Sequence, residues 1–501
     1  EITRVGQLML KDMRRDLFSH LQDLPHAYYD HAKIGQLMSR ITTDLNDITE
    51  FAHHYPEELF IAAIKIVVSF LILCRTNVLL TVIVFAALPL MVLFSRIFSK
   101  KMRETFKLSR HLLGELNASV EDSLLGIRVV KSFANEDVER EKFAEKNARF
   151  LQIKKMLYTN MAGFHTVPRL FDGLMYIIVV MLGAVFMIDG KITASDLIAY
   201  LLYVTTLLAS IRRLVEFSEQ FQRGVTGIER FTDVMHEPVT IADAPNARAL
   251  QNVSGEIEFD HVSFSYDTGL KQVLSDINLH VRPGESIALV GPSGGGKTTL
   301  TNLIPRFYDA TEGAVYIDDC NVNSMDEHTL RAAVAVVPQK ALLFSGTIRD
   351  NLLWGKSDAT QAELDSACRT ACADEFIKNT PNGYDSILGQ GGVNLSGGQK
   401  QRLSLARALI RTPKILILDD CTSALDADTE ARVLSSICET ARGMSVLLIS
   451  QRISTVMKVD RILCLENGLM RGLGTHDELM RICPLYREIY ASQIGGEADG
   501  N

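Results

Sequence analysis

Four apolar runs before residue 212 constrain the fold of this 501-residue chain more than any other feature. Taken singly, each run could be a buried helix of a soluble protein, because a helix needs about 20 apolar residues to cross a bilayer. Together they form two hairpins with short polar turns at 75–77 and 189–196, and this pairing favours membrane-spanning helices. The four runs are 60–74, 78–98, 174–188 and 197–211.

Basic residues mark the ends of these runs that lie away from the two turns. The turns themselves carry only Arg75 and Lys191. Because the cytoplasmic flanks of spanning helices are enriched in Lys and Arg, we expect the long charged segments in the cytoplasm, below a multi-pass domain in the cytoplasmic membrane. The residues that set this orientation are Lys100, Lys101, Arg103, Lys107, Arg110, Lys154, Lys155, Arg212 and Arg213.

The second half of the chain has the pattern of an α/β domain. Apolar stretches at 257–266, 277–281 and 286–290 predict β-strands. The stretch before them contains Gly224 and Gly227 together with two prolines, and we interpret it as a linker. The predicted division is a transmembrane domain with long cytoplasmic helices at 1–217, a linker at 218–254 and the α/β domain at 255–501.

Charge and cysteine content restrict the setting of the α/β domain. The chain has 52 basic and 60 acidic residues, a net charge of −8, and this balance argues against broad binding to nucleic acid. The spacing of its 8 cysteines fits neither a zinc motif nor a disulfide framework. We therefore expect reduced thiols in a cytosolic domain.

The segment GPSGGGKTT at 291–299 follows a predicted buried strand and precedes a helical pattern, and it fits G-x-x-x-x-G-K-[ST]. Glycines allow a tight loop whose backbone N–H groups point at phosphate oxygens. The lysine of such a loop reaches the outer phosphates, and the next hydroxyl binds Mg²⁺. The sequence therefore predicts the phosphates of a nucleotide and Mg²⁺ at this loop, held by Gly291, Pro292, Ser293, Gly294, Gly295, Gly296, Lys297, Thr298 and Thr299.

Two further segments complete a set of motifs. The string LSGGQ at 395–399 opens an amphipathic helix and offers N–H groups at its N-terminus. The apolar run 415–418 then ends at Asp419 and Asp420, at the end of a predicted strand where α/β sheets place ligands. One carboxylate could hold a metal ion and the next could act as a base. The LSGGQ residues considered for nucleotide binding are Ser396, Gly397, Gly398 and Gln399.

With these motifs in this order, the chain resembles an ABC exporter half-transporter, in which a membrane domain is fused to a nucleotide-binding domain. The glutamine-loop string VVPQ and the D-loop string SALD lie at matching places and contribute Gln339 and Asp426. The resemblance implies an α-helical transmembrane bundle plus an α/β P-loop ABC ATPase domain. Such half-transporters carry six spans, so we expect the N-terminal spans to be missing from this chain.

The resemblance also implies roles for single residues. Tyr266 matches the aromatic side chain that stacks on adenine, while Gln339 and Asp419 join Thr298 as Mg²⁺ ligands. In the family, two chains meet head to tail, and each ATP lies between one chain's phosphate loop and the other chain's LSGGQ. Breaks near 27–35 and 124–132 match coupling helices that relay closure to the membrane.

Two positions that bear on catalysis depart from the family's usual pattern, and a smaller departure is Gln390, where the family often has Glu. Asp420 stands where most members have Glu to polarise the attacking water, and its carboxylate is one methylene shorter. A displacement of about 1 Å can cost about a hundredfold in rate. Gln451 stands where most members have His, and an amide carries no charge near neutral pH. Both belong to the site on this chain's own phosphate loop, whereas LSGGQ is intact.

This pattern resembles the degenerate subunit of a heterodimeric multidrug or lipid exporter. We expect ATP-driven export of hydrophobic or amphipathic compounds, a lipid bilayer around the helices, and a second half-transporter with Glu and His at the two positions. Three alternatives stay open at this point. They are a homodimeric lipid or drug flippase, a soluble ABC ATPase that acts on DNA or ribosomes without transport, and a regulated channel or ATP-binding regulator that does not pump.

Overall fold

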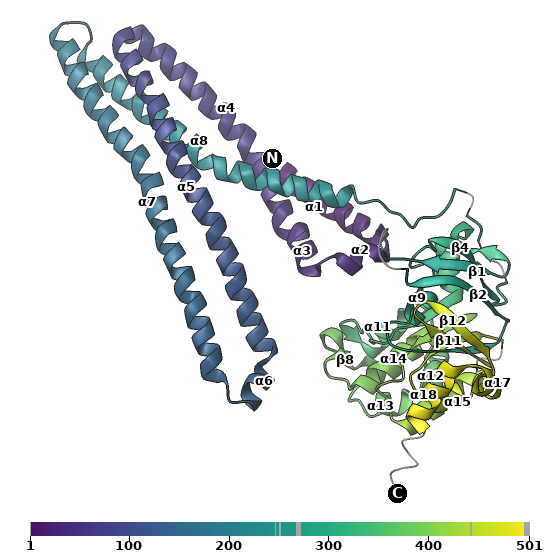
Figure 1. Ribbon diagram of the computed structural model, residues 1–501. Helices are drawn as coiled ribbons and strands as arrows, with labels where there is room; N and C mark the ends of the chain where they lie inside the picture. The colour runs from purple at the N-terminus through teal and green to yellow at the C-terminus, as the bar shows by residue number, and fades with distance from the viewer. Residues whose placement is uncertain (1, 246, 250–251, 267–271, 441–442, 495–501) are drawn as a thin grey trace. The chain divides into compact units, whose positions relative to one another are not determined.

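The computed structural model describes residues 2–245, 247–249, 252–266, 272–440 and 443–494 and divides the chain into two compact units (Figure 1). The first unit is helical and comprises Glu1–Leu21 and Ile34–His236. The second unit contains all the β-strands of the described residues and comprises Gln22–Lys33 and Glu237–Asn501. Residues 22–33 therefore belong to the second unit, although they lie between helices of the first along the chain.

Long helices make up the first unit. Four of them, within the part of the chain that the structure describes, are long and apolar enough to cross a membrane. This confirms the four predicted spans. Helix α5 packs along α7, and α4 packs along α8. The elements are α1 (Ile2–Asp23), α3 (Ile34–Ser39), the π-helical turn η1 (Arg40–Asp44), α4 (Leu45–Thr76), α5 (Val78–Leu125), α6 (Ile127–Ser132), α7 (Glu136–Ile188) and α8 (Ala194–Met235).

Helix α8 differs from the sequence-based expectation. We expected a linker from residue 218, but α8 continues without a break to Met235. The two glycines that suggested a linker instead allow close packing between helices. A Cβ on Gly224 would lie 2.4 Å from side-chain atoms of Phe51, and one on Gly227 would lie 3.0 Å from the carbonyl oxygen of Asp44. The stretch without regular structure therefore begins only after α8.

A buried tyrosine ties α8 to the hairpin between α4 and α5. The Tyr200 hydroxyl lies 2.7 Å from the carbonyl oxygen of Leu73 and 2.6 Å from that of Asn77. It also lies 2.8 Å from the Thr81 hydroxyl. Leu73 belongs to the last turn of α4, and Asn77 is the residue between α4 and α5. The contact therefore fixes the turn between α4 and α5 against α8, inside an apolar cluster that includes Leu80, Met175 and Leu207.

Two larger sheets and a small hairpin form the second unit. The six-stranded sheet has the order β12-β11-β3-β10-β9-β6, and it is parallel except at β12. The antiparallel four-stranded sheet has the order β2-β1-β4-β5. The strands are β1 (Ile257–Phe264), β2 (Leu274–Val281), β3 (Ser286–Val290), β4 (Glu312–Ile317), β5 (Cys320–Asn321), β6 (Val334–Val337), β7 (Gly346–Thr347), β8 (Ile387–Leu388), β9 (Ile415–Asp419), β10 (Ser445–Ile449), β11 (Arg461–Glu466) and β12 (Leu469–Gly474).

Helices and apolar side chains complete this unit. One core joins the two larger sheets, for example through Phe259 and Leu289, and a second core surrounds Leu403 of α14. The short cross-helix expected near 27–35 is α2 (His26–His31). The other helices are α9 (Lys297–Asn302), α10 (Glu327–Ala333), α11 (Ile348–Leu353), α12 (Gln361–Thr370), α13 (Asp374–Lys378), α14 (Gly397–Leu409), α15 (Ala427–Thr440), α16 (Ile453–Val456), α17 (His476–Ile482) and α18 (Pro484–Ile494), with the 3₁₀ turns η2 (Val322–Ser324), η3 (Gly383–Asp385) and η4 (Gln390–Gly392).

Candidate functional site

The predicted phosphate loop connects β3 to α9 at the carboxyl end of the parallel strands. Gly291, Gly294 and Gly296 have φ values of +146°, +77° and +98°, which side chains disfavour. A Cβ on Gly291 would also lie 1.9 Å from the carbonyl oxygen of Leu465. Both the backbone conformation and the space therefore require glycine at the start of this loop.

Lys297 begins α9 and folds back over this loop. Its ammonium group donates to the carbonyl oxygens of Gly291 at 2.9 Å and Pro292 at 2.8 Å. Burial lowers the pKa of Lys297, and the nearby carboxylates of Asp419 and Asp420 counteract this effect. The structure thus places the positive charge at the mouth of the loop, close to both acids.

Thr298 and Asp419 meet directly. The Thr298 hydroxyl lies 3.1 Å from Oδ1 and 3.0 Å from Oδ2 of Asp419, which ends β9. Burial raises the pKa of Asp419, the hydrogen bond from Thr298 lowers it, and the charge of Asp420 raises it. Two of the three predicted metal ligands are therefore side by side, and both offer oxygen atoms.

Asp420 lies between two amide side chains. Its Oδ2 accepts hydrogen bonds from Nε2 of Gln339 at 3.0 Å and from Nε2 of Gln451 at 3.3 Å. Burial raises the pKa of Asp420, the Gln339 hydrogen bond lowers it, and the negative charge of Glu430 raises it. The structure therefore brings together the two positions that depart from the family's usual pattern and the glutamine-loop residue.

Tyr266 lies at the other end of the phosphate loop. Its hydroxyl is 2.9 Å from the Thr299 hydroxyl, and the residue is 42% exposed. The edge of the Tyr266 ring meets Tyr308, with ring centroids 5.2 Å apart. A partly exposed aromatic face beside the loop is suited to stacking on a flat heterocycle.

The LSGGQ residues form a separate feature at the start of α14. The Ser396 hydroxyl accepts a hydrogen bond from the Gln399 N–H at 3.3 Å, and the Ser396 N–H donates to Oε1 of Gln399 at 2.9 Å. These two bonds form a capping box at the N-terminus of α14. Neither of the two bonds involves a residue of the phosphate loop. A Cβ on Gly397 would lie 3.4 Å from the Ala424 side chain, and one on Gly398 would lie 3.0 Å from the Ala424 carbonyl oxygen.

Asp426 caps the next helix, α15. Its Oδ2 accepts a hydrogen bond from the Thr429 N–H at 2.9 Å, and this bond lowers the pKa of Asp426. Gln401 of α14 fixes the same loop from the other side, because its Oε1 accepts from the Ala424 N–H at 3.0 Å. The D-loop at 423–426 is thus bonded to the LSGGQ helix and to α15.

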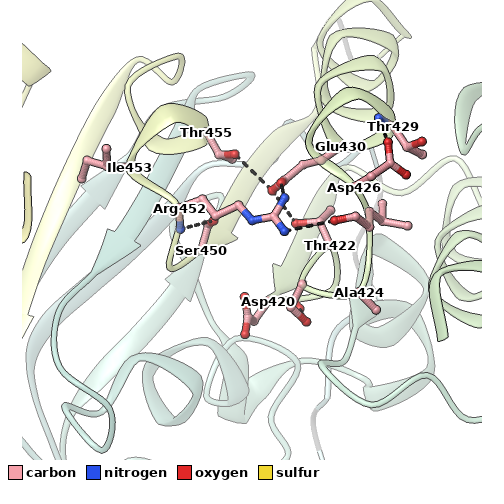
Figure 2. A network of polar contacts seen from close by, with 12 residues as sticks. Asp420, Thr422, Ala424, Asp426, Thr429, Glu430, Ser450, Arg452, Ile453 and Thr455 are labelled. Atoms are coloured by element: carbon pink, nitrogen blue, oxygen red, sulfur yellow. Dashed lines mark hydrogen bonds and ion pairs between the residues drawn. The ribbon is translucent and has the colours of Figure 1, made fainter. Parts of the chain in front are cut away.

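Sequence reasoning missed two charged residues behind this loop, Glu430 and Arg452. Figure 2 shows their side chains paired between the D-loop and α16. A signal for Glu430 was present, because Val433 and Ile437 follow it on the buried face of α15. A carboxylate on an apolar helix face needs a partner. No comparable signal marks Arg452, which simply follows Gln451.

Gln493 of α18 was also missed. Its Nε2 donates to the carbonyl oxygen of Gln451 at 2.6 Å, and its Oε1 accepts from the Ile453 N–H at 2.8 Å. The backbone on both sides of Arg452 is therefore held by one side chain from the last described helix.

Comparisons with known proteins agree with this arrangement. Residues 2–211 match the family described as ABC transporter transmembrane region, and residues 274–423 match the family described as ABC transporter. The chain is similar to the uncharacterized ABC transporter ATP-binding protein YwjA of Bacillus subtilis (strain 168), with 38% identity over 484 residues that cover 97% of this chain and 84% of YwjA.

A second relative and a solved structure extend the likeness. YgaD of the same organism, named as a candidate multidrug export ATP-binding/permease protein, is 35% identical over 486 residues, which cover 97% of this chain and 84% of YgaD. The structure of a bacterial Atm1-family ABC exporter with ATP bound superimposes with a TM-score of 0.85 and 29% identity. It covers 98% of this chain, and the match covers 87% of that exporter chain.

Proposed function

Because the chain belongs to the ABC transporter family, with its membrane region and its ATPase in one polypeptide, we propose that it is one subunit of a heterodimeric exporter whose own ATP site turns over slowly. The helical unit is embedded in the membrane and the nucleotide-binding domain is cytoplasmic, as in bacterial ABC exporters. ATP hydrolysis in this family is coupled to transport.

The nucleotide site is proposed from the contacts around the phosphate loop. Residues 291–299 would hold the phosphates of ATP, and Tyr266 would stack on adenine. Thr298 and Asp419 converge as oxygen donors, and Gln339 bonds Asp420, the residue after Asp419. Oxygen ligands of this kind suit Mg²⁺. When bound, Mg²⁺ neutralises charge that develops on the transferred phosphate.

One observation carries the proposal of slow turnover. The only groups donating to Asp420 Oδ2 among the described hydrogen bonds are the amides of Gln339 and Gln451. Neither amide can supply a proton or a positive charge near neutral pH. A short carboxylate between two amides can bind and orient a water molecule, but it lacks the reach of Glu and the protonatable ring of His. Nucleotide would therefore be held and seldom cut.

The requirement for a second subunit is supported by the helical unit. Apolar side chains of and beside α6 are exposed in the isolated chain, including Val129 at 60% and Phe133 at 71%. ABC exporters work as dimers, and an apolar face on a cytoplasmic helix is suited to contact with another chain. We propose that the partner carries Glu and His at the positions of Asp420 and Gln451.

The transported compounds are proposed to be hydrophobic or amphipathic. Two observations support this class: the name of the relative YgaD and the apolar character of all four spans in the described chain. No nucleic-acid partner is proposed, because the net charge of the whole sequence is −8.

The test compares ATP turnover by the full chain in lipid nanodiscs, alone and with a second half-transporter. Alone, the chain is expected to bind ATP and to turn over slowly. The double substitution Asp420→Glu with Gln451→His should raise kcat at least about tenfold, because general acid–base groups contribute about a hundredfold or more. Adding Lys297→Ala to this double variant should abolish the gain.

Brisk turnover by the unsubstituted chain, together with export of an amphipathic dye by vesicles that contain it alone, would contradict the asymmetric assignment. It would instead identify a homodimeric flippase. ATP turnover without movement of dye or lipid by any pairing would point to an ABC ATPase without transport.

A further inference from the structure

A buried carboxylate behind the ATP site gathers three polar partners. The Glu430 side chain is 4% exposed. Its Oε1 accepts hydrogen bonds from the hydroxyls of Thr422 at 2.8 Å and Thr455 at 3.1 Å. Its Oε2 forms an ion pair with Nη1 of Arg452. Glu430 therefore joins the segment after β9, the helix α15 on which it lies, and α16 (Figure 2).

Arg452 carries this connection in two directions. Its Nη2 donates to the carbonyl oxygen of Leu425 in the D-loop at 3.0 Å. Its own backbone is part of the segment that contains Gln451, whose amide donates to Asp420. One guanidinium group thus holds the D-loop and the Gln451 segment at a fixed separation.

The D-loop continues the connection to the LSGGQ helix. The Ser423 hydroxyl donates to the carbonyl oxygen of Asp420 at 2.9 Å, and Gln401 bonds both Ser423 and Ala424. Gly398 packs against the Ala424 carbonyl oxygen. A continuous set of contacts therefore runs from Asp420 and Gln451 through Arg452 and the D-loop to the signature residues.

The pair is poorly explained as a device for stability alone. Removing two charges from water carries a large desolvation penalty, and well-packed apolar residues often stabilise a core equally well. What an Arg–Glu pair adds is fixed geometry, because the planar guanidinium group binds two acceptors at once. Both acceptors here, Glu430 and Leu425, belong to segments that flank the ATP site.

We propose that Arg452 and Glu430 are positioning residues that relay the state of this chain's own ATP site to its LSGGQ segment. This inference rests on the proposed pairing of that segment with ATP bound by a second subunit. A change at Gln451 shifts the backbone of Arg452, and the D-loop and Gln401 pass the shift to α14. Loss of the pair therefore leaves nucleotide binding intact and disconnects the two ends of the relay.

The experiment measures hydrogen–deuterium exchange and ATP turnover of the full chain in lipid nanodiscs, with and without Mg·ATP. In the unsubstituted chain, ATP should protect both the phosphate loop at 291–302 and the segment 395–429. Arg452→Lys keeps the charge but loses the fork that binds two acceptors. We expect it to retain protection at 291–302, to lose it at 395–429, and to lower kcat about tenfold with KM within about twofold.

A second substitution and a matched control complete the design. Glu430→Gln keeps the size of the side chain and its acceptor for the two threonine hydroxyls, and it should give the same pattern as Arg452→Lys. Arg432 also lies on α15, but its pair with Glu375 is exposed at 3.4 Å. Arg432→Lys should behave as the unsubstituted chain, because exposed pairs of this kind contribute little.

Three results would overturn the relay. The first is unchanged protection at 395–429 in both test variants, and the second is loss of protection at 291–302 as well, which would indicate a merely structural role. The third is absence of any ATP-dependent protection at 395–429 in the unsubstituted chain. Failure of the asymmetric assignment is distinct from all three, because it is detected as brisk turnover by the unsubstituted chain.

Discussion

At the residue scale, Asp420 is constrained by its backbone as well as by its side chain. Its φ is +43°, in the left-handed region where Asp is tolerated better than most residues. It follows Asp419 directly and lies close to the buried Glu430, so three carboxylates are concentrated at one end of β9. Burial and the neighbouring negative charges therefore destabilise the ionised form of Asp420 in the folded chain. The hydrogen bonds from Gln339 and Gln451 and the positive charge of Lys297 partly offset this effect.

The raised pKa of Asp420 predicts how the free energy of unfolding depends on pH. Burial raises this pKa above the ordinary value of 3.8. The folded state therefore binds its proton more tightly than the unfolded state, and stability from this group is present below pH 3.8 and lost as pH rises through the raised value. Asp420→Asn removes the charge and keeps an oxygen acceptor, so it should raise Tm at neutral pH by about 2–4 °C.

The difference between Asp420→Asn and the unsubstituted chain should narrow as the pH falls toward 3.8. Asp319→Asn is the matched control, since Asp319 also has a positive φ, +60°, but its side chain is exposed. A constant difference across the pH range in thermal unfolding curves would show that the charge of Asp420 is not the cause.

At the scale of elements, α2 depends on its docking for its order. It has six residues, none of them buried, and so short a helix is unstable alone. The Tyr308 hydroxyl donates to Oδ2 of Asp30 at 2.5 Å and lies 2.9 Å from Nδ1 of His26, and His26 stacks on Phe307. Tyr308 also touches Tyr266, so α2 and the proposed adenine position share one aromatic neighbour.

Tyr308→Phe should loosen α2 while leaving the aromatic packing in place. A hydrogen bond to a charged group contributes about 1.5–3 kcal/mol, so amide exchange at 26–33 should accelerate about tenfold or more. Tyr384→Phe is the control, because the Tyr384 hydroxyl makes a similar bond to Asp365 at 2.8 Å away from α2. Equal exchange of 26–33 in both variants would mean that the hydroxyl of Tyr308 does not hold α2.

The elements also show where prediction from the sequence succeeds and where it stops. The apolar runs and the glycine loop were predictable because their signals lie within one segment. The continuation of α8 was not, since only the position of Phe51 reveals why Gly224 lies inside a helix. The network of Glu430 and Arg452 joins segments 22 residues apart in the chain and leaves only a faint local signal.

At the scale of the whole molecule, family membership makes the single chain half of a transporter. We propose that the exposed apolar residues near α6 contact the second subunit. A charge placed on such a surface must be desolvated when two chains associate. The free-energy cost of this desolvation weakens association between chains and does not destabilise the fold of either chain. Mutations there separate assembly from nucleotide binding.

Val129→Asp should therefore weaken association of two subunits about tenfold or more, which corresponds to about 1.4 kcal/mol. Leu151→Asp is the control, because Leu151 is also exposed, at 54% against 60% for Val129, but lies farther along α7, away from α6. Light scattering of the purified protein measures the association of subunits, and an ATP-binding assay checks that the nucleotide site is intact. Loss of ATP binding in Val129→Asp, or equal dissociation in both variants, would contradict the assignment of this surface.

Gln493 has a practical consequence for anyone who handles this protein. Its amide bonds the backbone on both sides of Arg452 from the last described helix. Affinity tags, fluorescent fusions or trimmed expression boundaries placed close behind α18 would disturb the ATP site from outside. For kinetic measurements, such tags are better attached at another position in the chain.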